Sequence, residues 1–315
     1  MIGIFYRKNG AIQVSESVRD LHDFHVEDVV WIDLIDPQDS ELDAVESFLG
    51  TEVQNKAKAE EIESSSRFRE TDNAIYANTN FLMPGPEEYY MEPVSFTIVG
   101  KTLTTTRDVP LRSFTELQHK MMAMPRLFPD GYRVFVSILD QRVDLDADTI
   151  ELMGKETEQF SKRINQKEDI NEDFLLDINR LQENTTIVRE NIVDKQRLIT
   201  NIMKSDKYPL ELEPTLNVLL QDIKSLINHT NFTFERLEYL QDTALGLINL
   251  DQNNIMRMFT LLSLLFMPPT LVASFFGMNV KLPLEGLDIA WILILLVMIF
   301  SFVIILIIFK RKKML

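Results

Sequence analysis

Two uncharged runs near the end of the chain constrain its fold more than any other feature. Residues 258–276 carry no charge over 19 positions, and residues 289–309 carry none over 21. A hydrocarbon core about 30 Å thick needs roughly 20 apolar residues in a helix, so each run is long enough to span a bilayer. One such run also fits a buried helix of a soluble protein. Two neighbouring runs that end in the basic cluster 310–313 favour a membrane protein.

The residues that flank these runs predict the orientation of the chain. The basic cluster 310–313 directly follows the second run, and Arg257 precedes the first. The connecting loop, residues 277–288, holds one basic and two acidic residues. By the positive-inside bias, both ends then lie in the cytoplasm and the short loop lies outside. The first residues turn polar too soon for a signal peptide. We therefore expect a multi-pass protein of the cell (inner) membrane, with spans at about 255–276 and 289–309.

Charge is distributed unevenly along the chain. The net charge is −16, with +4 on residues 255–315 and −20 on residues 1–254. A domain this acidic repels nucleic acid and anionic headgroups and concentrates cations, although plain solubility explains the charge equally well. The chain has no cysteine, which excludes thiolate zinc sites and disulfides. We find no glycine-rich phosphate loop, nucleophile elbow or pair of catalytic acids, so we expect no catalytic residues, no cofactor and no enzyme.

The first 142 residues alternate between strand-like and helix-like patterns. Strands are predicted at 2–6, 29–34, 73–82 and 94–106, the last with a turn at 100–101. Helices are predicted after residue 40 and at 111–124, the first with Ser40 as N-cap and Gly50 just past its end. This mixture predicts a compact α/β domain within an α+β membrane protein.

Residues 143–254 read as helices that form a stalk, and residues 255–315 as the transmembrane domain. Pro214 suits the first turn of a helix. From Leu216 to Leu247, apolar and threonine side chains alternate at three and four residues, the repeat of a coiled-coil seam. No breaker follows, so we expect one helix over 214–276, about 90 Å long at 1.5 Å per residue. The alternative is an ordinary helical bundle that ends in a membrane anchor.

Polar side chains in the first span lie on one face. At about 100° per residue they form a stripe roughly 80° wide. Several copies around an axis would line a narrow pore with this stripe, but Ser and Thr stripes also join transmembrane helices. We favour the pore because the same face, continued into the seam below, would assemble an oligomer. The stripe comprises Thr260, Ser263, Thr270 and Ser274, with Asn253, Met256 and Met267 on or beside it.

Short motifs in and before the spans resemble one known family. The tripeptide GMN at 277–279, directly after a span that contains MPPT at 267–270, resembles the signature of CorA-type magnesium transporters. Its place before a short loop, a second span and a basic tail strengthens the match. The stretches NNIMRMFT at 253–260 and VVWIDLIDPQDSEL at 29–42 also resemble that family. The resemblance covers nearly the whole chain.

This resemblance implies a homopentamer with an α/β/α cytoplasmic funnel, stalk helices that continue into the pore, and a second ring of spans that faces lipid. Gly277, Met278 and Asn279 would form the outer selectivity ring, in which Asn279 contacts the hydration shell of the ion. Asn253, Met256, Met267 and Thr270 match other pore positions of the family. The implied partners are further copies of the chain, divalent cations and the bilayer, with Mg²⁺ as cargo and as a regulatory ligand.

The chain departs from the family pattern at the stalk acid that helps to bind regulatory Mg²⁺ between subunits. An ungapped alignment from Asn253 places Val218 near that position. Asp222, one turn later, is the candidate substitute for this regulatory metal site. Two alternatives therefore stay open: closure by cytoplasmic Mg²⁺ at Asp222, and gating without a metal between subunits.

Three functions remain in competition. The leading hypothesis is a passive channel for Mg²⁺, with Co²⁺ or Ni²⁺ as further cargo, driven by the membrane potential. The second is a zinc transporter of the ZntB type with proton coupling; such relatives usually vary the middle residue of the motif, so Met278 argues against it. The third is a membrane-anchored scaffold or sensor without transport, which leaves the polar stripe unexplained.

Overall fold

The computed structural model describes residues 1–54, 67–85, 88–278 and 289–312. Contacts divide the chain into two compact units, Met1–Gln241 and Asp242–Leu315. The boundary between these units falls inside the longest helix. The predicted division at residues 142 and 254 stays a prediction.

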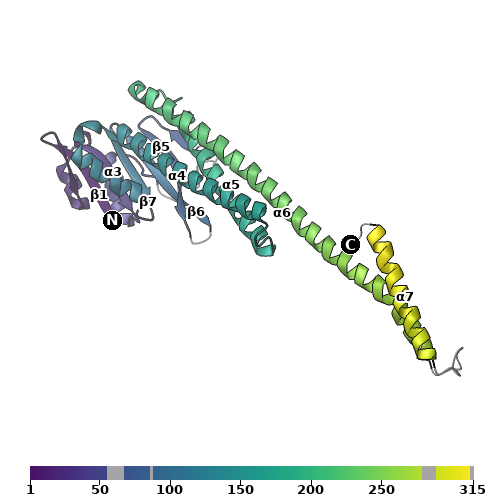
Figure 1. The fold of residues 1–315 in the computed structure, drawn as a ribbon. Helices are drawn as coiled ribbons and strands as arrows, with labels where there is room; N and C mark the ends of the chain where they lie inside the picture. The colour runs from purple at the N-terminus through teal and green to yellow at the C-terminus, as the bar shows by residue number, and fades with distance from the viewer. Residues whose placement is uncertain (55–66, 86–87, 279–288, 313–315) are drawn as a thin grey trace. The chain divides into compact units, whose positions relative to one another are not determined.

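A seven-stranded sheet forms the centre of the N-terminal unit (Figure 1). Its strand order is β2-β1-β3-β7-β6-β5-β4, and only the central pair β3 and β7 is parallel. The predicted strands are present, and the turn at Gly100 has a φ of 58°. The short edge strands β2 and β4 were not predicted. The strands are β1 (Ile2–Lys8), β2 (Ala11–Ser15), β3 (Val29–Ile35), β4 (Phe68–Glu70), β5 (Ala74–Pro84), β6 (Tyr89–Val99) and β7 (Thr102–Arg107).

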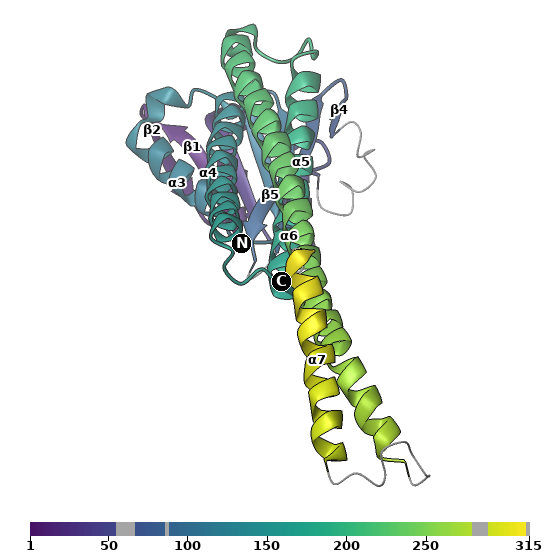
Figure 2. The same ribbon diagram turned by 45° about the vertical axis from the view of Figure 1, so that its right-hand side comes forward.

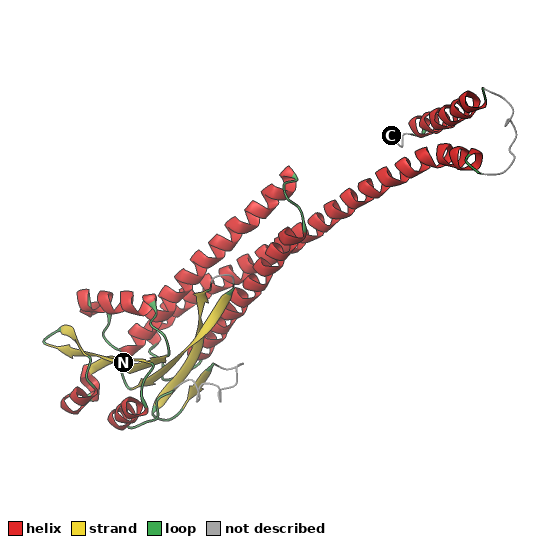
Figure 3. Ribbon diagram, turned by 90° about the horizontal axis from the view of Figure 1, so that it is seen from below, coloured by secondary structure: helices red, strands yellow, loops and turns green. Residues whose placement is uncertain are grey.

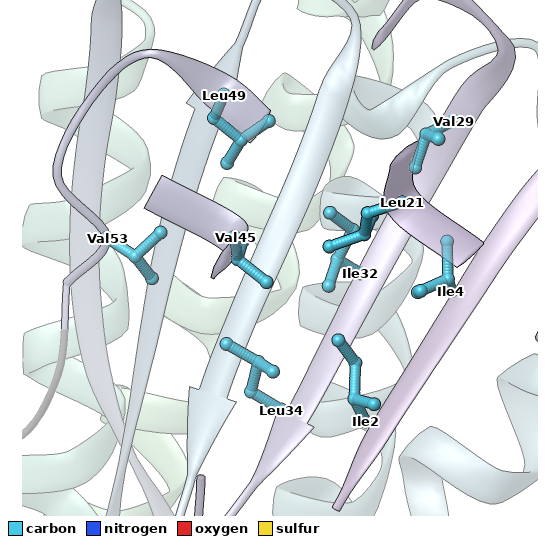
Figure 4. Packing of buried hydrophobic residues seen from close by; sticks show 9 residues of the cluster. All are labelled: Ile2, Ile4, Leu21, Val29, Ile32, Leu34, Val45, Leu49 and Val53. Atoms are coloured by element: carbon cyan, nitrogen blue, oxygen red, sulfur yellow. The ribbon is translucent and has the colours of Figure 1, made fainter. Parts of the chain in front are cut away.

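Helices cover both faces of this sheet, which confirms the predicted α/β/α layers (Figure 3). Helix α1 (Asp39–Leu49) and the 3-10 turn η1 (Val18–Asp23) pack on one face. In Figure 4, Val45, Leu49 and Leu21 from these two elements surround Ile32 and Leu34 of β3. The other face carries α3 (Arg112–Ala123), α4 (Gly131–Gln166) and α5 (Glu172–Ile202). Strand β3 is buried at six successive positions because both of its faces are covered.

The ends of two helices show how the local sequence sets the fold. Helix α1 begins at Asp39 behind Gln38, whose backbone N–H donates to Glu41 Oε2 at 3.0 Å. The prediction of Ser40 as N-cap is therefore wrong. The capping box starts two residues earlier, with Gln38 as N-cap and Glu41 three residues after it. Gly50 ends this helix with a φ of 68°, as predicted. Helix α4 begins at Gly131, where a Cβ atom would lie 2.3 Å from the backbone nitrogen of Leu103.

Helix α6 runs without interruption over Glu213–Phe276, 64 residues, which confirms the single long helix. Figure 2 shows its first part beside α4 and α5. The seam on this part is buried within its own chain: Leu216, Leu219, Ile223, Thr230, Thr233, Leu237 and Leu240 are at most 3% exposed. The Gln241 side-chain amide also donates to Asn179 Oδ1 of α5 at 2.6 Å. The interpretation that this face assembles an oligomer is therefore wrong.

In the C-terminal unit, the end of α6 lies beside α7 (Ala290–Arg311), as Figures 1 and 2 show. The rings of Phe266 and Phe302 are 6.1 Å apart between their centroids. In the most apolar 18-residue stretch of each helix, 0% of the residues are buried in α6 and 6% in α7. A core helix of a soluble protein would be mostly buried, so the two helices are candidate membrane spans.

Candidate ion-conduction site

The predicted polar stripe forms one face of α6. All seven of its residues, from Asn253 to Ser274, are exposed. Four of them, Ser263, Met267, Thr270 and Ser274, line a single groove with Met278, a groove of about 640 Å³ that opens along the helix. The groove thus joins Met278 of the predicted selectivity motif to the C-terminal half of the predicted stripe. Asn253, Met256 and Thr260 lie on the same helix before the groove.

The stripe faces away from the second span. The half-buried residues of this part of α6 are Leu261, Leu265, Pro268, Pro269, Val272 and Phe276. At about 100° per residue, they lie on the opposite side of the helix from Thr260, Ser263 and Met267. The face of α6 that packs on α7 is therefore not the polar face. The polar face is left open for water or for another copy of the chain.

The threonine hydroxyls of the stripe have a defined orientation. Thr260 Oγ1 donates to the Met256 carbonyl at 2.8 Å, and Thr270 Oγ1 donates to the Phe266 carbonyl at 2.7 Å. A hydroxyl that gives its proton to the helix backbone keeps its acceptor lone pairs free. The water molecules around a cation point their hydrogens outward. The stripe therefore presents acceptors of the kind that a hydrated cation requires.

Two prolines lie within the same span, at Pro268 and Pro269. A proline has no backbone N–H, so the carbonyls of Leu264 and Leu265 lack their usual helical donors. Backbone of this kind is tolerated in a bilayer where protein or water supplies the missing hydrogen bonds. Neither Leu264 nor Leu265 lines the groove.

The GMN tripeptide at 277–279, the predicted selectivity motif, is described only in part. The Gly277 N–H donates to the Ala273 carbonyl at 3.0 Å, and the Met278 N–H donates to the Phe275 carbonyl at 3.4 Å. Helical hydrogen bonding thus continues through the first residues of the motif. A Cβ atom at Gly277 would lie 3.1 Å from the Ala273 oxygen, which is a tight contact. Asn279, the predicted ligand of the hydration shell, lies outside the described residues.

Asp222, the candidate regulatory ligand, is an exposed residue of α6. It faces an acidic cluster on α4 of the same chain. Partial burial raises the pKa of Asp140, Asp144 raises it further, Lys120 opposes this, and Asp222 adds to the rise. Across the described residues, no three His, Asp or Glu side chains have the geometry of a metal site. Within the part of the chain that the structure describes, Asp222 belongs to no such group.

Sequence reasoning missed the apolar lining of the groove. Phe266, Leu271 and Phe275 contribute to it beside the polar residues. Phe266 and Leu271 lie four residues from Thr270 and Met267, so helical spacing around the stripe would have identified them. The sequence analysis selected polar residues and methionines alone.

A family model described as CorA-like Mg²⁺ transporter protein matches residues 26–311. The chain belongs to the CorA-like Mg²⁺ transporter family. This membership confirms the resemblance to CorA proteins, and it makes the chain a membrane transporter rather than an enzyme.

Relatives of this CorA-like chain match it over nearly its full length. The magnesium transport protein CorA of Wolinella succinogenes is 32% identical over 320 residues, covering 99% of each chain. The complete structure of the CorA magnesium transporter from Methanocaldococcus jannaschii superposes with a TM-score of 0.81 at 17% identity, covering 99% of this chain and 98% of that one. The ZntB cytoplasmic domain from Vibrio parahaemolyticus covers 79% of this chain and 98% of its own, with a TM-score of 0.59 at 15% identity. The fold of the N-terminal part is therefore shared with a ZntB protein, and this fold does not decide the ion.

Proposed function

We propose that this CorA-like protein is a homopentameric channel that carries Mg²⁺ into the cytoplasm, driven by the membrane potential. The observation that carries this proposal is the open groove on α6, where three hydroxyl residues and two methionines lie beside Phe266, Leu271 and Phe275. The polar residues of this groove are on a different face of α6 from the half-buried residues. The name of the Wolinella relative supports Mg²⁺ as the ion. The stripe also disfavours an anchor without transport, because an anchor needs no such groove.

Self-assembly follows from what one chain lacks. A single helix face cannot enclose an ion path, so several copies must place their stripes around one axis. Outside the buried seam, α6 of the N-terminal unit exposes Val218, Phe232 and Tyr239, each more than 60%. Large apolar side chains exposed on one helix are typical of a contact with another protein surface. The number five comes from the family resemblance.

Selectivity is assigned to the end of the first span. Asn279 would accept hydrogen bonds from the water shell of the ion, and the backbone of Gly277 and Met278 would offer carbonyls to it. Mg²⁺ gives up its water reluctantly, so a ring of neutral acceptors binds the hydrated ion without trapping it. Met256 and Met267, both about 60% exposed, would form apolar constrictions between polar rings at Asn253 and Thr270. Hydrated Co²⁺ and Ni²⁺ satisfy the same ring.

Regulation is assigned to the acidic cluster around Asp222. The charges of Asp144 and Asp222 both repel the Asp140 carboxylate and raise its pKa. Divalent cations at this cluster would reduce the repulsion between α4 and α6. If Asp222 supports closure, flux falls as internal Mg²⁺ rises, and Asp222→Asn weakens that fall.

A liposome assay tests the transport proposal. Purified protein should admit Mg²⁺ under an inside-negative potential, and Asn279→Ala should abolish the flux, whereas Ser301→Ala in α7 should leave it unchanged. Thr270→Val removes the acceptor hydroxyl at constant shape and should lower the flux by up to about tenfold, the loss expected for one hydrogen bond to a water of the ion's shell. Thr270→Ser keeps that hydroxyl and should restore most of the flux.

The same liposomes decide between Mg²⁺ and zinc transport. Flux of Mg²⁺, Co²⁺, Ni²⁺ and Zn²⁺ is measured with and without a pH gradient. Transport of Zn²⁺ alone, coupled to the pH gradient, would establish the ZntB-like alternative. Mg²⁺ flux that persists in Asn279→Ala would remove the selectivity ring from the proposal.

A further inference from the structure

A cavity beside the sheet edge in the N-terminal unit collects three arginines. It has a volume of about 530 Å³ and is formed by one face of α5 together with β5, β6 and the residue before β4. Arg67, Arg189 and Arg197 line it, against the acids Glu190 and Asp194. The cavity thus has a formal charge of +1, within residues 1–254 that carry −20. This reversal of sign is local to the cavity.

The arginines are only partly neutralised by their own surroundings. Asp194 lies between two guanidinium groups, 2.7 Å from Arg67 Nη2 and 3.5 Å from Arg197 Nη1. One carboxylate therefore serves two cations. The Nε of Arg67 is buried and has no hydrogen-bond partner among the described residues. An unsatisfied buried donor of a charged group is costly, so the charge of Arg67 is incompletely compensated by the described residues.

The floor of the cavity has further unused hydrogen-bonding capacity. Among the described residues, the side-chain amide of Asn80 donates to the weak acceptor Met91 Sδ, at 3.6 Å. The backbone carbonyl of Asn80 accepts from Asn191 Nδ2 at 2.7 Å and from Lys195 Nζ at 3.2 Å. These bonds hold Asn80 in place from behind. Its amide is consequently a positioned donor at the floor of the cavity.

We propose that this cavity binds the phosphate group of a phosphate-bearing small molecule. Arginine forks match phosphate oxygens in pairs, and three arginines suit a group with two or more negative charges. The cavity is much larger than a phosphate ion and falls in the range of small-molecule sites. The apolar surfaces of Met91 and Val193 line the remaining space and accommodate the organic part. A nucleotide, a sugar phosphate or a lipid headgroup carries this chemistry.

Calorimetric titration of the full-length protein in neutral detergent tests this site. ADP, inorganic pyrophosphate and short-chain phosphatidic acid are the probes, with EDTA present so that no divalent cation links the probes to the acidic surface. Tighter binding of ADP identifies a soluble ligand, and tighter binding of phosphatidic acid identifies a lipid headgroup. Either result supports the phosphate site, and the assay is independent of ion flux.

Substitutions around the cavity give effects of opposite sign. Arg189→Gln and Arg197→Gln should each weaken binding about tenfold, because each removes one phosphate contact. Glu190→Gln, next to Arg189, removes a competing charge and should strengthen binding. Arg180→Gln, an exposed arginine of the same helix that lines a different cavity, should change nothing. Circular dichroism checks that each variant is folded.

Two outcomes overturn the proposal. The first is the absence of binding for all three probes at concentrations up to about 1 mM. The second is binding that stays equally tight in Arg189→Gln and Arg197→Gln. Such binding would lie elsewhere on the protein.

Discussion

At the scale of single residues, the centre of the N-terminal unit depends on one buried ion pair. Asp33 of β3 and Arg107 of β7 are each 2% exposed, with Asp33 Oδ2 and Arg107 Nη2 at 2.7 Å. Asp33 also accepts from Thr105 Oγ1 at 2.8 Å and from Gln118 Nε2 at 3.1 Å. Arg107 lies over the ring of Phe114 at 4.4 Å. Every charge in this group is compensated, which makes the loss of one partner costly.

We predict that Asp33→Asn lowers the unfolding free energy of the protein by about 3–5 kcal/mol, the cost of leaving a buried charge unpaired. Thermal unfolding in detergent, followed by circular dichroism, measures this change. Arg112→Gln is the matched control, since it breaks an exposed pair with Glu116 that is 88% and 51% exposed. It should cost less than about 0.5 kcal/mol. Equal, small effects of both changes would show that the buried pair is not needed for stability.

Replacing Asp140 should stabilise the protein, in contrast to replacing Asp33, and this effect should depend on pH. Partial burial, Asp144 and Asp222 raise the pKa of Asp140 in the folded protein. A carboxyl whose pKa is higher in the folded protein than in the unfolded chain stabilises the fold at a pH below the unfolded pKa. This stabilisation is lost as the pH rises through the folded pKa. We therefore expect Asp140→Asn to unfold at a higher temperature than the unmodified protein at pH 7.

This advantage of Asp140→Asn should vanish as the pH falls into the range where the Asp140 carboxyl is protonated. Melting curves at pH 7, 5 and 4 measure it. Glu151→Gln serves as a control of opposite sign, because a hydrogen bond to Lys155 lowers the pKa of Glu151. A constant difference between Asp140→Asn and the unmodified protein at every pH would contradict the acidic cluster.

At the scale of elements, α6 uses different faces for different purposes. Its seam packs on its own chain, and its polar stripe faces away from α7. Leu237 of the seam is fully buried, whereas Tyr239, two residues later, is 68% exposed. Leu237→Ala should lower the unfolding free energy by about 2–5 kcal/mol through the cavity that it leaves.

Tyr239→Ala should cost less than Leu237→Ala in the stability of one subunit, because the Tyr239 side chain is 68% exposed. If copies of the chain meet on this face, Tyr239→Ala weakens the oligomer instead. Light scattering after size exclusion measures the mass, and melting curves measure the stability. If the seam rather than the outer face joins subunits, Leu237→Ala will weaken the oligomer and Tyr239→Ala will not.

At the scale of the whole molecule, the absence of cysteine allows a direct test of the pore axis. If the stripes face one another across a shared axis, as we propose, Ser263→Cys should be crosslinked between subunits by a short thiol reagent. Leu262→Cys, the neighbouring residue on a different face, should give several-fold less crosslinked dimer. Electrophoresis of the treated protein measures both. Equal crosslinking at the two positions would contradict a shared pore along the stripe.

Particular elements show which parts of the fold could be predicted. Strand β3 was recognised because an apolar run of this kind fits a strand covered on both faces. Strands β2 and β4 were missed because they are short and lie at the sheet edges, where pairing with a neighbour decides the conformation. The seam was found at the correct residues but assigned to the wrong partner. A heptad repeat reports that a face is buried and contains no information on which chain buries it.

The sequence by itself determined the two spans, the continuous helix that precedes them, the polar stripe and the family motif. Each depends on local composition or spacing along one helix, and helix geometry converts these directly into length and face. Only the tertiary structure decided that the seam packs on its own domain, that the stripe lies opposite to α7, and that Arg67 joins Arg189 and Arg197 in one cavity. These arrangements join residues up to about 130 positions apart, and only packing brings such residues together.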